Sequence, residues 1–147
     1  MEQLFLADLA GLTDNEVREH IAAEYSGEPY YGESVRAPDT ASDIRAQLNA
    51  FDIIIAQESV GSFGCDSSSW FLLKHRETGD LFELNGAHCS CYGFEGQFEL
   101  ERVFAETLRE IAQGERRRAR FVSCGWKCEG EDADNDAVVA YILRNFK

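Results

Sequence analysis

The chain has 147 residues, 44% of them hydrophobic and 12% aromatic, and its formal net charge at pH 7 is −13. This length suits a single domain spanning residues 1–147, and the ten phenylalanines argue against a disordered acidic tail. A charge of this sign repels nucleic acid and anionic membranes, so we do not expect direct binding to DNA, RNA or a lipid surface.

The negative charge is concentrated in the first 114 residues. Residues 1–60 carry 12 acidic and 3 basic residues (−9), residues 61–114 carry 9 and 4 (−5), and residues 115–147 carry 6 and 7 (+1). An excess of carboxylates attracts basic protein surfaces, although solubility alone is a simpler reason for it. Four arginines between residues 116 and 120 are a local exception.

The cysteine content and the first residues indicate the cellular compartment of the protein. No apolar run approaches the ~18 residues that a membrane helix needs, and Met1-Glu2 does not open a basic export signal. The five cysteines are an odd number, so free thiols or a metal site are more expected than a disulfide framework. We therefore expect a cytoplasmic protein.

In chain order, the first expected element is a helix that begins after Thr13. Thr13 and Glu16 have the spacing of a capping box, in which each side chain bonds the backbone amide of the other residue. Val17 and Ile21 follow at helical spacing, and Gly27 ends the helix.

A long loop and a second helix come next. Residues 28–39 contain both prolines and indicate the loop, and residues 40–50 indicate a helix with Ile44 and Leu48 facing inward. Residues 51–55 are a continuous apolar run, typical of a strand buried on both faces.

The second half of the chain completes the expected fold. It contains strands at 69–75 and 81–84 joined by a turn at 77–80, a helix at 99–112, a short strand at 119–123 and a helix at 134–145. The order favours an α+β fold, with an antiparallel or mixed sheet of about three to four strands packed with about four helices. A repeated βαβ winding is not expected.

Residues 86–97 are too glycine-rich and aperiodic for a helix or strand, so we expect a loop of defined shape. This loop has the densest group of residues that could bind a metal or react. Zinc takes four nitrogen or sulfur ligands, and the candidates here and further along the chain are His88, Cys89, Cys91, Cys124 and Cys128. Neighbouring side chains such as His88 and Cys89 diverge, however, and the gap from Cys89 to Cys91 is tight for one ion.

Two other interpretations of the loop remain open. Cys89 or Cys91 beside His88, with Cys65 in a second Gly/Ser-rich loop, could form a reactive thiolate, but the surrounding negative charge would raise a thiol pKa. Alternatively, the cysteines are small buried hydrophobic residues and His88 fixes the loop by a hydrogen bond.

Three segments carry a resemblance: residues 62–64, residues 70–73 and the run His-Cys-Ser-Cys-Tyr-Gly-Phe-Glu-Gly-Gln at 88–97. Together they resemble a group of small uncharacterised proteins encoded by bacteriophages and mobile elements, over about a quarter of the chain. The resemblance implies such an origin, in which small acidic proteins are often inhibitors of host defence. It carries no catalytic assignment.

The leading functional prediction is a non-enzymatic binding protein of the host cytoplasm. Its acidic surface would occupy a basic, nucleic-acid-binding surface of a host protein, as in an anti-CRISPR or anti-restriction factor. The predicted partner contacts are Glu28, Tyr30, Tyr31, Glu33, Asp39 and Asp43. The alternatives are a zinc- or thiol-dependent enzyme centred on residues 88–91, and an accessory protein whose cysteine loop is purely structural.

Overall fold

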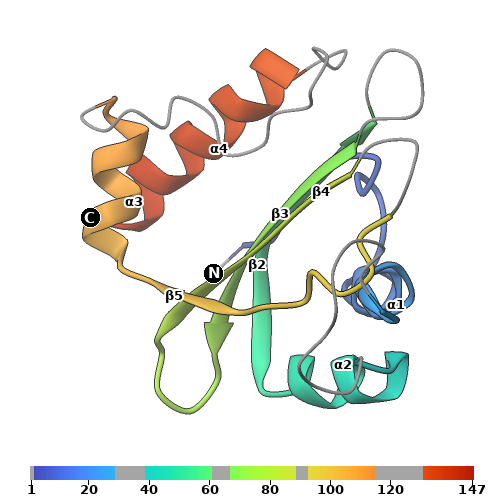
Figure 1. The fold of residues 1–147 in the computed structure, drawn as a ribbon. Coiled ribbons are helices and arrows are strands. Elements are labelled where there is room, and N and C mark those ends of the chain that lie inside the picture. The colour runs from blue at the N-terminus through green and yellow to red at the C-terminus, as the bar shows by residue number, and fades with distance from the viewer. Residues whose placement is uncertain (1, 29–38, 61–66, 89–92, 115–130) are drawn as a thin grey trace.

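The computed structural model describes residues 2–28, 39–60, 67–88, 93–114 and 131–147. Within these residues one mixed sheet has the order β1-β2-β3-β4-β5 (Figure 1). Its strands are β1 (Leu4–Ala7), β2 (Phe51–Val60), β3 (Ser67–His75), β4 (Leu81–His88) and β5 (Glu101–Val103). β1 runs parallel to β2, and every other neighbouring pair is antiparallel.

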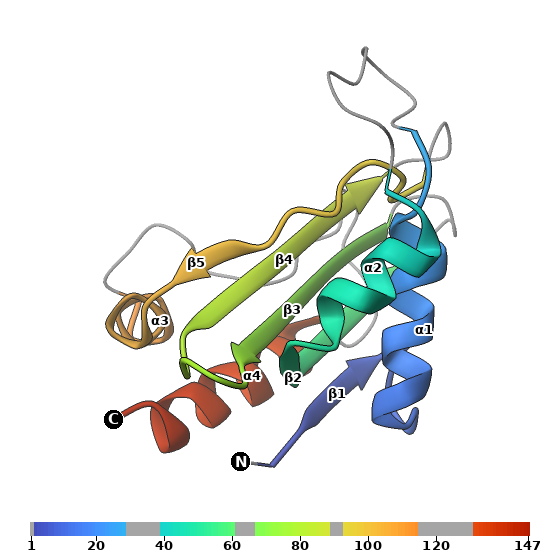
Figure 2. The same cartoon turned by 90° about the horizontal axis from the view of Figure 1, so that it is seen from below.

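Four helices cover the two faces of this sheet. They are α1 (Asp14–Tyr25), α2 (Ala41–Leu48), α3 (Ala105–Ala112) and α4 (Glu131–Asn145). α1 and α2 lie on one face and α3 and α4 on the other, so the sheet is the middle layer of three (Figure 2). Among the described helices, none has both the length and the apolar character needed to cross a bilayer.

The expected α+β class, the mixed sheet and the four helices are confirmed, but the sheet has five strands instead of three or four. The prediction lacked two of these strands, β1 and β5, and β1 has four half-buried residues and no polar alternation to mark it. β1 pairs with β2 through a crossover that contains α1 and α2. One parallel βαβ-type unit therefore lies at the edge of an otherwise antiparallel sheet.

Two other predictions were wrong in detail. Residues 99–112 are not one helix, because residues 101–103 pair with β4 as β5 before α3 begins at Ala105. Residues 86–88 are not loop, because they continue β4 in register with β3. The predicted strand at 119–123 lies outside the described residues.

Local sequence explains where α1 and α2 begin. The Thr13 hydroxyl accepts from the Glu16 amide at 3.2 Å, and the Glu16 carboxylate accepts from the Thr13 amide at 3.2 Å, which confirms the predicted capping box. Thr40 and Asp43 form the same arrangement at the start of α2.

Apolar side chains form a separate core on each face of the sheet. The core under α1 and α2 includes Val17, Ile21, Ile44, Ala56 and Phe71. The core under α3 and α4 includes Ile55, Trp70, Leu108, Val138 and Ile142. A register shift between Ile53 and Ile55 places the consecutive residues Ile54 and Ile55 on the α3–α4 side, so β2 is buried on both faces as predicted.

Candidate functional site

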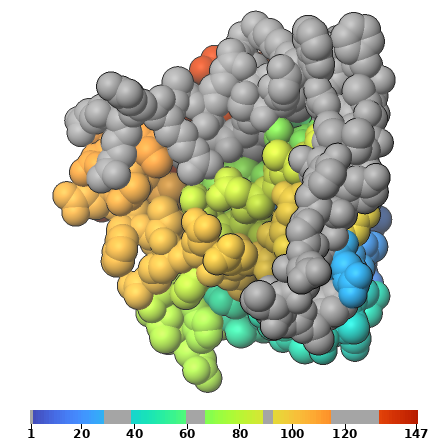
Figure 3. All heavy atoms as spheres, in the orientation of Figure 1, coloured from blue at the N-terminus to red at the C-terminus, as the bar shows by residue number. Residues whose placement is uncertain are grey.

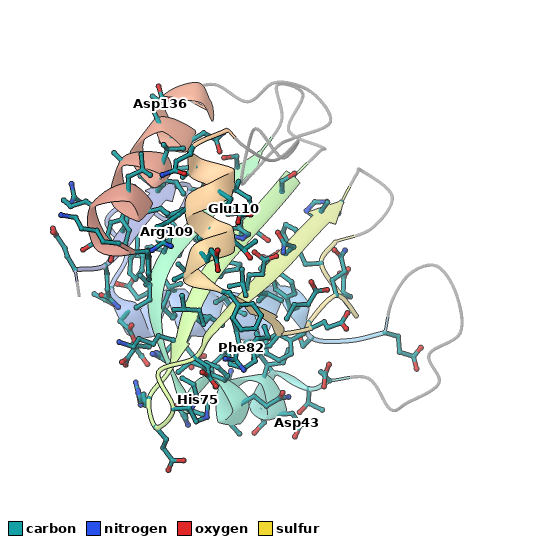
Figure 4. The ribbon with its side chains drawn as sticks, turned by 90° about the vertical axis from the view of Figure 1, so that its left-hand side faces the viewer. Asp43, His75, Phe82, Arg109, Glu110 and Asp136 are labelled. Atoms are coloured by element: carbon teal, nitrogen blue, oxygen red, sulfur yellow. The ribbon has the colours of Figure 1, made fainter. Side chains whose placement is uncertain are left out.

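Of the predicted partner contacts, the structure describes three. Glu28 is exposed just after α1, and Asp39 is half-buried just before α2. The Asp39 carbonyl accepts from the Gly27 amide at 2.9 Å, so the two ends of the intervening segment meet. Asp43 lies on the exposed side of α2 and also caps that helix (Figure 4). Tyr30, Tyr31 and Glu33 lie outside the described residues.

Of the predicted zinc ligands, only His88 is described. It ends β4, is half-buried, and its ring meets Phe94 edge-on with 4.5 Å between ring centroids. Cys89, Cys91, Cys124 and Cys128, like Cys65, lie outside the described residues. Among the residues that the structure describes, no three His, Cys, Asp or Glu side chains are grouped so as to hold a metal ion. Zinc binding through the cysteines stays a prediction.

The exposed side of the α1–α2 layer is strongly acidic. We define the α1–α2 acidic face by its exposed carboxylates, Glu16, Glu19, Glu24, Glu28 and Asp43. The described residues of this layer include two cations. Arg18 is buried on the inner side of α1. The exposed Arg45 donates to the Glu19 carboxylate at 2.8 and 2.9 Å. The face therefore keeps a clear excess of negative charge.

Charges of both signs are mixed on β5, the edge strand opposite β1, and on α3. Arg102 on β5 pairs with Asp80 at 2.9 Å and lies 4.9 Å from the ring of Phe104. Arg109 and Glu110 are neighbours on α3 (Figure 4). Figure 3 shows the surface of β5 and α3, and the sequence of these two elements contains Arg102 and Arg109 beside the three carboxylates Glu101, Glu106 and Glu110. The carboxylates of the described residues are therefore not spread evenly among the cations.

A buried polar row crosses the sheet beside the acidic face. In the register of the four strands, Ala7 is opposite Glu58, Glu58 is opposite Ser69, and Ser69 is opposite Gly86. Glu58 and Ser69 are both buried on the side that α1 covers. This row lies where the parallel strands β1 and β2 end, the position at which α/β units commonly bind ligands.

α1 supplies two side chains to this row. Nε2 of His20 lies 2.6 Å from Oε2 of Glu58, and the side chains of His20 and Glu58 are 27% and 8% exposed. One turn further along, the Tyr25 hydroxyl bonds the Ser69 hydroxyl, and the Tyr25 ring stacks on Phe94 at 5.1 Å. The helix thus joins the polar row to the apolar core.

The electrostatics of His20 follow from three carboxylates. The hydrogen bond with Glu58 raises the pKa of His20 against the opposing effect of burial, and the charges of Glu58, Glu24 and Asp8 raise it further. Partial burial, together with the charge of Glu58, raises the pKa of Asp8. Asp8 follows β1, and its amide donates to the Glu58 carbonyl at 3.0 Å.

The row also holds an unsatisfied acceptor. Oε1 of Glu58 is buried and has no hydrogen-bond partner in the described part of the chain, and the same holds for the side-chain amide of Gln57, which faces the opposite core. A buried polar atom without a partner costs roughly 1–3 kcal/mol, so such atoms usually mark a structural or functional requirement.

The sequence prediction did not include Asp8, His20 or Glu58. His20 and Glu58 are 38 positions apart and meet only through the crossover from β1 to β2. One sequence signal was available, because Gln57 and Glu58 directly continue the apolar run of β2 without a turn residue between them.

Comparison of the chain with protein-family models, curated protein sequences and solved structures gave no significant match.

Proposed function

We propose that this protein is a binding protein whose α1–α2 acidic face engages a basic surface of another protein. The observation that carries the proposal is the segregation of charge: among the described residues of the α1–α2 layer, five exposed carboxylates accompany one exposed cation, which is itself paired with Glu19. Electrostatic complementarity of this kind speeds association and fixes orientation.

The partner class follows from the charge and from the resemblance. Basic protein surfaces commonly bind nucleic acid, and the α1–α2 acidic face would compete with the phosphate backbone for such a surface. The resemblance to phage and mobile-element proteins favours a host-defence protein as the partner, of the type that anti-CRISPR and anti-restriction factors inhibit.

Two matched variants test the role of the face. The face triple is Glu19→Gln, Glu24→Gln and Glu28→Gln, which adds three charge units and releases Arg45 from its pair with Glu19. The turn triple is Glu77→Gln, Asp80→Asn and Glu101→Gln. It adds the same charge and releases Arg102 from its pair with Asp80, but on the β3–β4 turn and β5.

The measurement is capture of bacterial host proteins on the immobilised wild type and on each triple variant. We expect the wild type to retain nucleic-acid-binding proteins, added DNA to displace them, and the face triple to lower the association rate about tenfold at low salt. The turn triple should keep most of the binding. Equal losses in both variants, or capture that neither salt nor DNA weakens, would contradict the proposal.

A further inference from the structure

Beside the acidic face, at β1 and β2, lie three titratable groups of decreasing exposure: two carboxylates and one imidazole. Asp8 is exposed, the His20 side chain is 27% exposed and the Glu58 side chain is 8% exposed. The three groups interact, since Glu58 bonds His20 and the charges of Asp8 and Glu58 both act on His20. The set therefore leads from solvent at Asp8 to a buried carboxylate at Glu58.

One oxygen of the Glu58 carboxylate is not used within this set. Oε2 of Glu58 bonds His20, while Oε1 is buried and has no hydrogen-bond partner among the described residues. The acceptor needs a hydrogen-bond donor, and a ligand that brings one would remove the cost of leaving it unsatisfied. Glu58 is also the least exposed of the set, so its second oxygen is the innermost acceptor of the three groups.

The charge of the set defines the kind of donor. Glu24 on the next turn of α1 also acts on His20, so the charges of three carboxylates, one of them bonded at 2.6 Å, act on one imidazole. With the carboxylates ionised, two negative charges remain in excess even when His20 is protonated. An anion would be repelled, and a neutral donor would leave this excess uncompensated. A cationic donor satisfies both requirements.

We propose that Asp8, His20 and Glu58 form a subsite for one guanidinium group, supplied by an arginine of the basic partner. A guanidinium has several donors in one plane, so it can bond Glu58 and Asp8 together, and it is more weakly hydrated than an ammonium group. This subsite rests on the proposed function, because it gives the acidic face an anchor for one side chain of the partner.

The test uses arginine without its partner protein. Nα-acetyl-arginine amide is titrated into the full-length protein while the ring signals of His20, assigned with the His20→Gln variant, are followed by NMR. Nα-acetyl-citrulline amide is the control, because it has nearly the same shape and no charge. We expect a saturable shift with the arginine compound and none with the citrulline compound.

Three variants locate the binding. Glu58→Gln and Asp8→Asn should each weaken the arginine titration, the first by about tenfold or more, since a charge-assisted bond is replaced by a neutral one. Asp8 is exposed, so its variant keeps the test valid even if Glu58→Gln impairs folding. Glu83→Gln is the control, because Glu83 is a half-buried carboxylate that accepts from Trp70 at 3.2 Å in the other core.

The results separate the subsite from the wider function. Equal shifts with citrulline, the absence of saturation, or titrations unchanged in both Asp8→Asn and Glu58→Gln would overturn the subsite, even if the face triple still loses its partner. Specific arginine binding alongside capture that ignores the face triple would instead leave the subsite standing and remove the proposed function.

Discussion

Gly86 on β4 shows how closely the residues of the polar row approach one another. A Cβ atom at this position would meet the Tyr25 hydroxyl, and it would lie 2.7 Å from Cδ1 of Phe94 and 2.9 Å from Oγ of Ser69. None of these neighbours is the mobile end of a long side chain, because Tyr25 and Phe94 stack and Tyr25 bonds Ser69. The glycine is required for space at this position.

Gly86→Ala should therefore destabilise the protein by about 3 kcal/mol, the upper end of the usual cost of overpacking a core. The free energy of unfolding can be measured by urea titration. Combining Gly86→Ala with Tyr25→Phe removes one of the clashing atoms, so the double variant should lose less stability than the sum of the two single variants. A Gly86→Ala protein as stable as the wild type would contradict this packing.

At the scale of elements, α1 is held to the rest of the α1–α2 layer by a buried arginine. Nη1 and Nη2 of Arg18 donate to the carbonyls of Leu48 and Phe51 at 2.7 and 2.8 Å, and Nε donates to the Asp14 carboxylate at 2.5 Å. One guanidinium thus satisfies the end of α2 and the start of β2. The arrangement sets the position of α1, and with it the position of His20 over Glu58.

Arg18→Met should cost about 3 kcal/mol of unfolding free energy, because it leaves two carbonyls and a carboxylate without their donor. Arg45→Met is the matched control, since Arg45 forms an exposed ion pair with Glu19. Exposed pairs contribute about 0–1 kcal/mol, so the control should lose little stability. Similar losses in the two variants would show that burial of Arg18 has no special role.

The same scale shows what could be predicted from the sequence. The range of α1 followed from its capping box and apolar spacing, and the β3–β4 hairpin followed from its turn residues. The C-terminal end of β2 and the N-terminal end of β3 could not be predicted in this way. Ser67 and Ser68 were not predicted as strand, yet they are buried and pair with Val60 and Ser59 of β2.

The candidate site could not be predicted from the sequence, for a related reason. Periodicity identifies the elements of α1 and β2 but not how they pack together, and the bond between His20 and Glu58 depends on that packing. The parallel pairing of β1 with β2 gives no local signal either, since its partners are far apart in the chain. The acidity of the face was visible in the composition, whereas its segregation required the fold.

For the whole molecule, the net charge of −13 implies self-repulsion in the folded state. The repulsion should be strongest on the α1–α2 acidic face, where the described carboxylates outnumber the cations. Sodium chloride screens interactions beyond about 10 Å at 0.1 M, so it weakens this repulsion more than it weakens the short buried contacts of Arg18. We therefore expect added sodium chloride to raise the melting temperature.

The triple variants show whether the repulsion is local to that face. A gain of 1 kcal/mol corresponds to about 3 °C in Tm for a chain of this size, which thermal unfolding followed by circular dichroism resolves. The face triple should lose more of the salt dependence than the turn triple, because β3, the turn and β5 carry the cations Lys74, Arg76 and Arg102, whereas the described part of the α1–α2 layer has one exposed cation, Arg45. Equal salt dependence in both variants would mean that the charge acts evenly over the molecule. In that case the α1–α2 layer would have no stronger attraction for a basic partner than the rest of the surface.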